Sequence, residues 1–275
     1  MNLRGYLKML RVKEWIKFFT LIPLIGAILA DATPSALILV GIIFFCVIGY
    51  GFVINNYFDV EIDKRNTKKV RMGKNPLSAG KVTKKETLVL MSMLLVIPIA
   101  LSCFLTLTGI LFTVLSISFL TLYSVKYIRL KERFIVDIIT HGLMFGLFPF
   151  LAGFTLAGGN LNTLTLLVAA LFMIIGCEAL LTHQINDYRE DFGNSSTTVV
   201  RVGQKSGWVI LVFFILLSIA NLELIAYYSD IGMMLHGGAF AYLIAYPLYT
   251  CRGEIKGVIQ PDKVNEVIER LVAIL

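Results

Sequence analysis

Long apolar segments are the feature that most constrains this chain. Hydrophobic residues make up 57% of its 275 residues, and the mean hydropathy is +0.80, which exceeds what a soluble domain needs to fill its core. A helix of about 20 apolar residues crosses the hydrocarbon layer of a bilayer. Eight segments of this kind run over residues 17–31, 35–54, 87–105, 109–127, 134–157, 162–183, 207–229 and 231–250. The sequence therefore predicts an all-α, multi-pass transmembrane bundle with eight spans.

The basic residues give the orientation of the bundle, because cytoplasmic loops retain Lys and Arg. All 25 lie in the amino-terminal segment, in alternate connections, or after Cys251. The intervening connections near residues 31, 105–109, 158–162 and 229–230 contain none. We therefore expect an integral membrane protein with both termini in the cytoplasm. This asymmetry explains the net charge of +7, so a lipid bilayer and an anionic substrate are favoured as partners over nucleic acid.

Two acidic motifs follow apolar segments on the predicted cytoplasmic side. Their acidic positions are spaced by four residues, which places them on one face of a helix. Mg²⁺ prefers oxygen ligands and is often held by one or two carboxylates together with substrate phosphates. Two such faces suit one diphosphate bridged by two or more Mg²⁺ ions, although Asp and Asn at a membrane interface can also simply cap helices. The motifs are Asn55-Asn56-Tyr57-Phe58-Asp59-Val60-Glu61-Ile62-Asp63 and Asn186-Asp187-Tyr188-Arg189-Glu190-Asp191.

The motifs also indicate a weak internal repeat. Each follows a span, and each leads through a polar, glycine-containing loop into the next span; these loops cover residues 55–86 and 184–206. The pattern predicts one transmembrane domain over residues 1–275 with two related halves, about 1–130 and 131–275. Such repeats place the binding site at their interface. We therefore expect the two motifs to face each other across a central cavity.

Several motifs together resemble the UbiA superfamily of membrane-embedded prenyltransferases, from about Arg11 to Gly207. The resemblance implies an all-helical fold, generally of nine spans, and transfer of a polyprenyl group from an allylic prenyl diphosphate to an acceptor held in the membrane, with Mg²⁺. The acceptor would be an aromatic quinone precursor, a glyceryl lipid or another isoprenoid. Asn56 departs from the Asp often found there in the family. The motifs are the Asn-x-x-x-Asp-x-x-x-Asp run, Asn75-Pro76-Leu77-Ser78-Ala79-Gly80, Tyr123-Ser124 and the second Asp-x-x-x-Asp.

The resemblance assigns roles to individual positions. The implied metal ligands are Asn55, Asp59, Asp63, Asp187 and Asp191. The candidate diphosphate-binding residues are Asn55, Arg65, Lys74, Lys126, Arg129 and Lys131. Tyr123 is a candidate catalytic residue whose ring face would stabilise an allylic cation, or else an aromatic residue of the membrane interface. The candidate acceptor-site residues are Glu178, His183 and Asn186, and for Glu178 and His183 the alternative is a satisfied polar core.

Two other functions remain open on the sequence alone. The run from Leu10 to Lys17 is similar to the start of the family's decaprenyl-phosphate phosphoribosyltransferases, although the intact second acidic motif counts against that activity. Carboxylates in membrane proteins also mark ion pathways, which makes a cation-coupled transporter the alternative from another class. Transporter sites usually lie near the bilayer midplane, whereas these motifs lie at one face. Asp137, four residues after Arg133, is expected to form a helical salt bridge with it.

Overall fold

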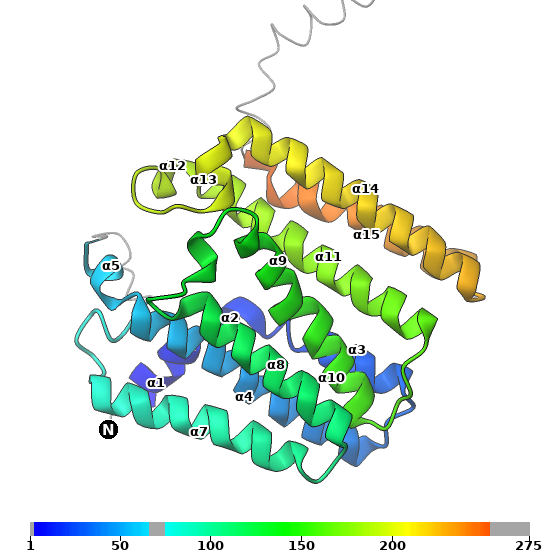
Figure 1. Ribbon diagram of the computed structural model, residues 1–275, viewed down its shortest axis with the longest axis horizontal. Coiled ribbons are helices and arrows are strands. Elements are labelled where there is room, and N and C mark those ends of the chain that lie inside the picture. The colour runs from blue at the N-terminus through cyan, green and yellow to red at the C-terminus, as the bar shows by residue number, and fades with distance from the viewer. Residues whose placement is uncertain (1–2, 66–74, 254–275) are drawn as a thin grey trace, which may run out of the picture.

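The computed structural model describes residues 3–65 and 75–253, and within these ranges every regular element is helical. This confirms the predicted all-α fold. Figure 1 shows the helices as a bundle with their long axes roughly aligned. The elements are α1 (Leu3–Leu10), α2 (Val12–Trp15), α3 (Leu21–Leu29), α4 (Pro34–Phe58), α5 (Val60–Arg65), α7 (Lys84–Ser102), α8 (Leu107–Ser124), η1 (Leu130–Glu132), α9 (Val136–Gly142), the π-helical turn η2 (Leu143–Leu147), α10 (Phe148–Leu156), α11 (Thr163–Asn186), α12 (Tyr188–Asp191), α13 (Thr198–Val202), α14 (Gln204–Tyr228) and α15 (Met233–Thr250).

Among the described residues, six helical segments are long and apolar enough to cross a membrane: α4, α7, α8, the continuous run α9–η2–α10, α11 and α14. They match six of the eight predicted spans and identify an integral membrane protein. The other two predicted spans correspond to α3, which has only nine helical residues, and α15. The polar His236 and the adjacent Gly237 and Gly238 dilute the apolar character of α15. The number eight therefore stays a prediction.

Short polar side chains begin several of the long helices. Thr33 accepts a hydrogen bond from the backbone of Ala36 at the start of α4, and Asn162 caps α11 in the same way. Thr83 and Glu86 form a reciprocal capping box at the start of α7. These side chains satisfy backbone N–H groups that have no partner inside the helix. The turns between spans are therefore fixed by local sequence.

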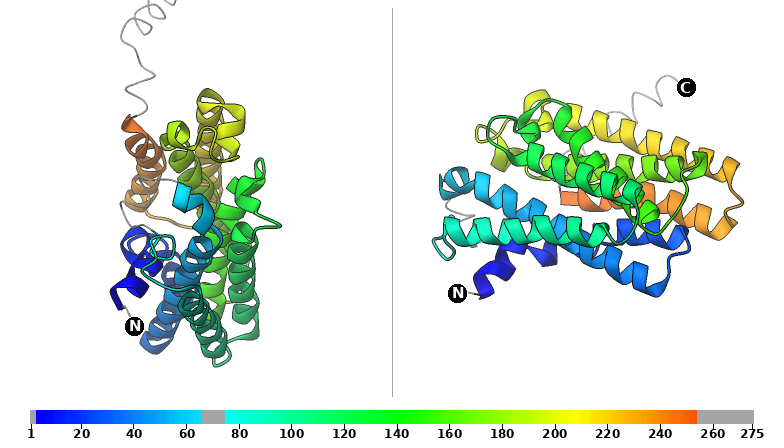
Figure 2. Two further views of the ribbon diagram at one scale, coloured as in Figure 1. Left: turned by 90° about the vertical axis from the view of Figure 1, so that its left-hand side faces the viewer. Right: turned by 60° about the horizontal axis from the view of Figure 1, so that its bottom comes forward.

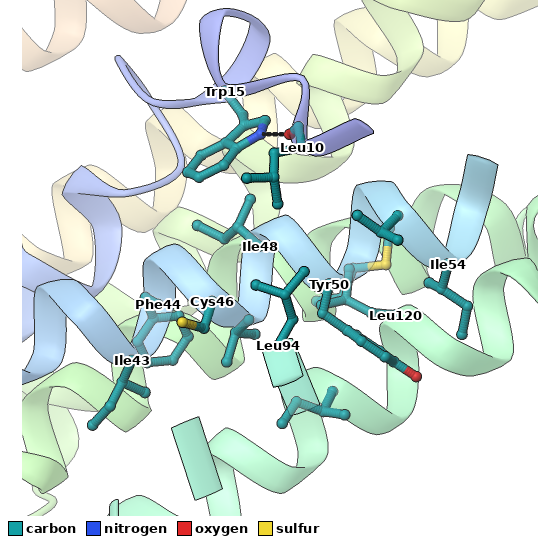
Figure 3. Packing of buried hydrophobic residues seen from close by; sticks show 14 of the residues in the cluster. Leu10, Trp15, Ile43, Phe44, Cys46, Ile48, Tyr50, Ile54, Leu94 and Leu120 are labelled. Carbon is teal, nitrogen blue, oxygen red and sulfur yellow. Dashed lines mark hydrogen bonds between the residues drawn. The ribbon is translucent and has the colours of Figure 1, made fainter. Parts of the chain in front are cut away.

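Helix α4 lies at the centre of the larger apolar core. Figure 3 shows side chains of α4 between those of the amino-terminal segment on one side and those of α7 and α8 on the other. Trp15 and Phe44 are fully buried there. The hydroxyl of Tyr50 is 2.8 Å from that of Thr121 on α8, so the polar end of this buried ring has a partner. In the same way α11 packs against α14 and α15.

Glycines bring α3 and α10 close together. A Cβ atom on Gly153 of α10 would lie 1.9 Å from the carbonyl oxygen of Pro23 on α3, and one on Gly26 would lie 2.4 Å from that of Phe150. Small residues let membrane helices approach until their backbones touch. Helices α3 and α10 are thus in backbone contact, and α5 and α12, which carry the ends of the acidic motifs, lie at the same end of the bundle (Figures 1 and 2).

Candidate active site

Both acidic motifs contain a helix break at their first aspartate. Helix α4 ends at Phe58, and Asp59 follows with φ −90° and ψ 0°. Helix α11 ends at Asn186, and Asp187 follows with φ −90° and ψ 1°. The two chain segments therefore share one backbone conformation in the sparsely populated bridge region, where active-site residues are often found. After each break a short helix, α5 or α12, carries the second aspartate.

The first motif is held by cationic side chains from the segment after α8. The ammonium nitrogen of Lys131 lies 2.5 Å from Oδ2 of Asp59 and 2.7 Å from Oδ1 of Asn55. A guanidinium nitrogen of Arg129 donates to Oδ1 of Asp59 at 3.2 Å, and its Nε lies 2.7 Å from Glu132. Burial lowers the pKa of the Lys131 ammonium, and the Asp59 carboxylate opposes this shift. The predicted diphosphate-binding residues Arg129 and Lys131 are thus at the motif.

Asp63 is oriented by the loop that contains Asn75. The buried Asn75 amide donates to Oδ2 of Asp63 and to the backbone oxygen of Asn56, both at 2.8 Å. Its side-chain oxygen accepts the N–H of Leu77 at 3.1 Å. The amide thereby fixes the loop against the motif helix, a role for Asn75 that the sequence did not indicate. Lys74 lies outside the described residues, and of Arg65 only the helical backbone is described.

The second motif is more open. Nε2 of His183 lies 3.1 Å from Oδ2 of Asp187, and the His183 side chain is 73% exposed. Asn186 donates to the backbone oxygen of Thr250, at the end of α15, at 3.0 Å. Asn186 therefore ties α11 to α15, whereas His183, Glu190 and Asp191 line a cavity.

A polar cavity of about 590 Å³ brings the two motifs together. It contains Asp59 and Asp63 from the first motif, Asp191 from the second, and the cations Arg129 and Lys131. Its other lining residues are Ile62, Tyr123, Glu132, Leu180, His183, Gln184, Glu190, Gly193, Asn194, Ser195 and Thr197. Asp187 is part of the adjoining helix break and does not itself line this cavity, and Lys126 is exposed and also absent from its wall.

An aromatic cavity of about 400 Å³ adjoins the polar one. The two share Tyr123, Leu180 and His183 in their walls. The remaining lining residues are Arg11, Glu14, Phe19, Gly51, Phe52, Asn55, Leu120, Ser124, His141, Met144, Phe145, Ala179 and Tyr246. Tyr123 therefore stands between a space rich in charge and a space rich in aromatic rings.

The oxygen donors of the polar cavity fit a divalent cation of the Mg²⁺ type. They are carboxylates from both motifs, Asp59 and Asp63 from the first and Glu190 and Asp191 from the second, and carboxylate oxygens are ligands that Mg²⁺ prefers. Within residues 3–65 and 75–253, no group of three or more His, Cys, Asp or Glu side chains is arranged to hold a metal ion by itself. Because Mg²⁺ is commonly held by few carboxylates together with substrate phosphates, the donor set suits a cation that arrives with a diphosphate.

Glu178 lines neither cavity. It is buried on α11 beside Ser218 of α14, and its Oε1 has no hydrogen-bond partner. The structure therefore does not bring Glu178 together with His183 and the cavity walls, since neither cavity includes it.

Asp137 was expected to pair with Arg133, and this prediction is wrong. Its buried carboxylate accepts hydrogen bonds from Gln184 and from the backbone of Thr198, both at 2.8 Å, and also from the Thr198 hydroxyl. Arg133 instead donates to the backbone oxygen of Ile128 at 2.8 Å. Asp137 thus connects α9, the end of α11 and the loop after the second motif, and Gln184 lines the polar cavity.

Comparisons with known proteins agree with this arrangement. The model of the UbiA prenyltransferase family matches residues 18–256. The digeranylgeranylglyceryl phosphate synthase of Methanocaldococcus jannaschii is 29% identical over 220 residues, covering 77% of this chain and 71% of that protein. The protein of the same name from Methanococcus aeolicus is 30% identical over 213 residues, covering 75% and 70%. A UbiA homologue from Archaeoglobus fulgidus, solved bound to DMAPP and Mg²⁺, has the same fold, with a TM-score of 0.77, 17% identity and coverage of 89% and 86%.

Proposed function

Because this chain belongs to the UbiA prenyltransferase family, we propose that it is a Mg²⁺-dependent membrane enzyme that transfers a prenyl group from an allylic prenyl diphosphate to a lipid acceptor and releases diphosphate. The observation that carries the proposal is the polar cavity, into which two acidic motifs from distant parts of the chain converge beside Arg129 and Lys131. The adjoining aromatic cavity supplies space for an isoprenoid chain. The charged diphosphate of the donor and its apolar prenyl chain can thus bind in two neighbouring cavities.

The diphosphate is assigned to the polar cavity. Asp59, Asp63 and Asp191, which line this cavity, would hold Mg²⁺ together with Asn55 and Asp187 of the same two motifs. The metal neutralises charge on the departing diphosphate when it is bound. Arg129 and Lys131 donate hydrogen bonds to phosphate oxygens, where their charge stabilises the leaving group as the carbon–oxygen bond breaks. Asn75 keeps Asp63 oriented for this task.

The prenyl chain is assigned to the aromatic cavity. Tyr123 lies in the wall shared by both cavities, and this position supports a role for its ring beside the allylic carbon. The ring face stabilises positive charge that develops there. Phe19, Phe52 and Phe145 line the same space and exclude water, so that the acceptor rather than water captures the allylic carbon.

The acceptor favoured by the comparisons is a glyceryl phosphate lipid. Seven relatives, all named digeranylgeranylglyceryl phosphate synthase, match this chain. The hydroxyl oxygen of such a lipid would form an ether bond to the allylic carbon, the diphosphate would leave with the bonding electrons, and the hydroxyl proton would pass to a base. His183, exposed and shared by both cavity walls, is our candidate for positioning the acceptor.

The polar cavity is placed on the cytoplasmic side of the membrane, and the chain is one domain of two related halves. The one-sided distribution of Lys and Arg supports the orientation. The matching helix breaks at Asp59 and Asp187 support the relation between residues 1–130 and 131–275. The cavity at the end of the bundle counts against a transporter with a midplane site, and the convergence of both motifs counts against a phosphoribosyl donor.

Transfer is tested with purified full-length protein in lipid nanodiscs. The assay supplies radiolabelled geranylgeranyl diphosphate, Mg²⁺ and separate acceptors: geranylgeranylglyceryl phosphate, 4-hydroxybenzoate and a dihydroxynaphthoate. We expect a labelled ether lipid and released diphosphate only with the glyceryl lipid. Transfer to neither lipid nor aromatic acceptor, with the donor intact, would contradict the proposed function. Transfer to an aromatic acceptor alone would retain the reaction and overturn the acceptor assignment.

A further inference from the structure

Arg11 has an unusual backbone conformation at the junction of α1 and α2. Its φ of 50° and ψ of 32° are in the left-handed region, which costs a residue with a side chain about 1–2 kcal/mol. Such conformations persist only where the surroundings enforce them, and they concentrate at functional sites.

Trp15 holds this junction in place. Its indole N–H donates to the backbone oxygen of Leu10 at 2.6 Å, as Figure 3 shows. The indole is fully buried, with ring centroids 5.3 Å from Phe45 and 6.2 Å from Phe52 of α4. The bend at Arg11 is thus anchored to the same helix that carries the first acidic motif.

The Arg11 guanidinium faces the aromatic cavity. It lies 5.2 Å from the ring centroid of Phe52, and it pairs with Glu14 through two hydrogen bonds, one of them 2.9 Å long from Nε. The Arg11 side chain is 21% exposed and that of Glu14 is 43% exposed. Both residues line the aromatic cavity, so a charged pair stands in a wall that is otherwise rich in rings.

Arg129 shares the left-handed backbone conformation of Arg11. Four residues other than glycine have positive φ in the described chain, and Arg11 and Arg129 are the two arginines among them. Arg129 lines the polar cavity and contacts Asp59 there. Arg11 lines only the aromatic cavity. Each compartment therefore has its own arginine, held in a costly conformation.

We propose that Arg11 binds the phosphate monoester of the acceptor lipid and so determines the acceptor class; this inference rests on the proposed function. Arginine matches phosphate with two parallel hydrogen bonds. The donor's diphosphate already has Arg129 and Lys131 in the polar cavity, so the cation in the other cavity serves a second anion. When the phosphate binds, it replaces the carboxylate of Glu14, the more exposed partner, as the partner of Arg11, and that carboxylate is then hydrated by water. The lipid's hydroxyl then lies within the cavity bounded by Tyr123 and His183.

The test compares kinetic constants of the full-length protein for two acceptors, geranylgeranylglyceryl phosphate and the dephosphorylated alcohol. We expect Arg11→Met to raise the KM for the phosphorylated lipid at least tenfold, to leave the donor KM within twofold, and to abolish the preference for the phosphorylated lipid. Arg11→Lys should restore part of that preference. The control Lys13→Met removes a neighbouring exposed cation that lines neither cavity and should change nothing.

Three results would overturn the inference. A rise in the donor KM of Arg11→Met would assign Arg11 to the diphosphate. An unchanged preference of this variant for the phosphorylated acceptor would show that Arg11 does not select the acceptor. Equal binding of the radiolabelled phosphorylated lipid to wild type and variant, in nanodiscs without donor, would show that Arg11 does not bind its phosphate. The binding arm separates this inference from the proposed function, because it gives a result even if no transfer occurs. Glu14→Gln removes the competing carboxylate and should lower the acceptor KM, which tests the inference even if Arg11→Met does not fold.

Discussion

The ammonium of Lys131 lies 2.5 Å from the carboxylate of Asp59, 72 residues earlier in the chain. Both side chains are mostly buried, at 14% and 15% exposure. A charge-assisted hydrogen bond of this length is among the stronger polar contacts in proteins. The loop after α8 is thereby attached to the first acidic motif, and the cation of this pair is available to a phosphate.

Lys131→Met should lower kcat/KM for the prenyl diphosphate by about 100-fold, the order expected when one preorganised charge is lost. Lys131→Arg should recover only part of the activity, because a rigid guanidinium does not bridge Asn55 and Asp59 as a compact ammonium does. Steady-state kinetics with varied donor will measure both. Lys126→Met is the matched control: Lys126 is exposed and lines neither cavity. A comparable loss in the control would show a general effect of loop charge.

Removal of divalent cations with EDTA should abolish transfer, and Mg²⁺ should restore it. Asp59→Asn should lower kcat/KM by about 100-fold or more because a neutral amide binds the metal and the cations less strongly. Asp230→Asn is the control, since Asp230 lies in the connection between α14 and α15 at the opposite end of the bundle (Figure 1). Full activity of Asp59→Asn in the presence of EDTA would sink the metal assignment.

Two neighbouring threonines give a stability test of the Asp137 network. The Thr198 hydroxyl contacts Asp137 and accepts the backbone N–H of Ile135 at 2.7 Å, whereas the buried Thr197 hydroxyl has no hydrogen-bond partner. Thr198→Val should cost about 2 kcal/mol, which corresponds to a fall of about 4–8 °C in melting temperature. Thr197→Val should leave the melting temperature unchanged or slightly raised. Thermal unfolding in one detergent will compare them, and equal effects would contradict the network's importance.

The backbone contact between α3 and α10 predicts a strong effect of one methyl group. Gly153→Ala places a Cβ 1.9 Å from the carbonyl oxygen of Pro23, so the two helices must separate, at a cost of about 3 kcal/mol or more. We expect reduced yield of monodisperse protein and a lower melting temperature. Gly237→Ala in α15 meets no atom within 4 Å and should be neutral or stabilising by about 0.5–1 kcal/mol. A stable Gly153→Ala variant would show that α3 and α10 move apart easily.

The periodic features of the sequence predicted the fold and the outline of the site. Spacing by four placed Asp59 and Asp63 near one another, and the common side of both motifs predicted their convergence. Six apolar spans were confirmed because length and hydropathy decide membrane insertion locally. The role of Asn75 was missed because its contact with Asp63 depends on how a loop folds back.

The features that the sequence did not predict depend on contacts between residues far apart in the chain. Spacing by four suggested Arg133 as the partner of Asp137, but two of the hydrogen-bond donors to this buried carboxylate, Gln184 and Thr198, lie 47 and 61 positions away in the chain. Nothing in the local sequence marks Arg11 as left-handed, since Trp15 and the rings of α4 impose that conformation. Interactions of this kind can be identified only from the three-dimensional arrangement of the helices.

The helix breaks at Asp59 and Asp187 have a further consequence for the lifetime of the protein. Two long helices end beside carboxylates, where the negative end of each helix dipole opposes the side-chain charge. Ligands that bind only the folded state stabilise it, and the stabilisation grows with the logarithm of ligand concentration above the Kd. A cation bound with diphosphate would also remove the repulsion between each carboxylate and its helix end. In a cell short of prenyl donor, the enzyme would thus be less stable. Local unfolding, and with it proteolysis, would begin at the end of the bundle that contains the polar cavity.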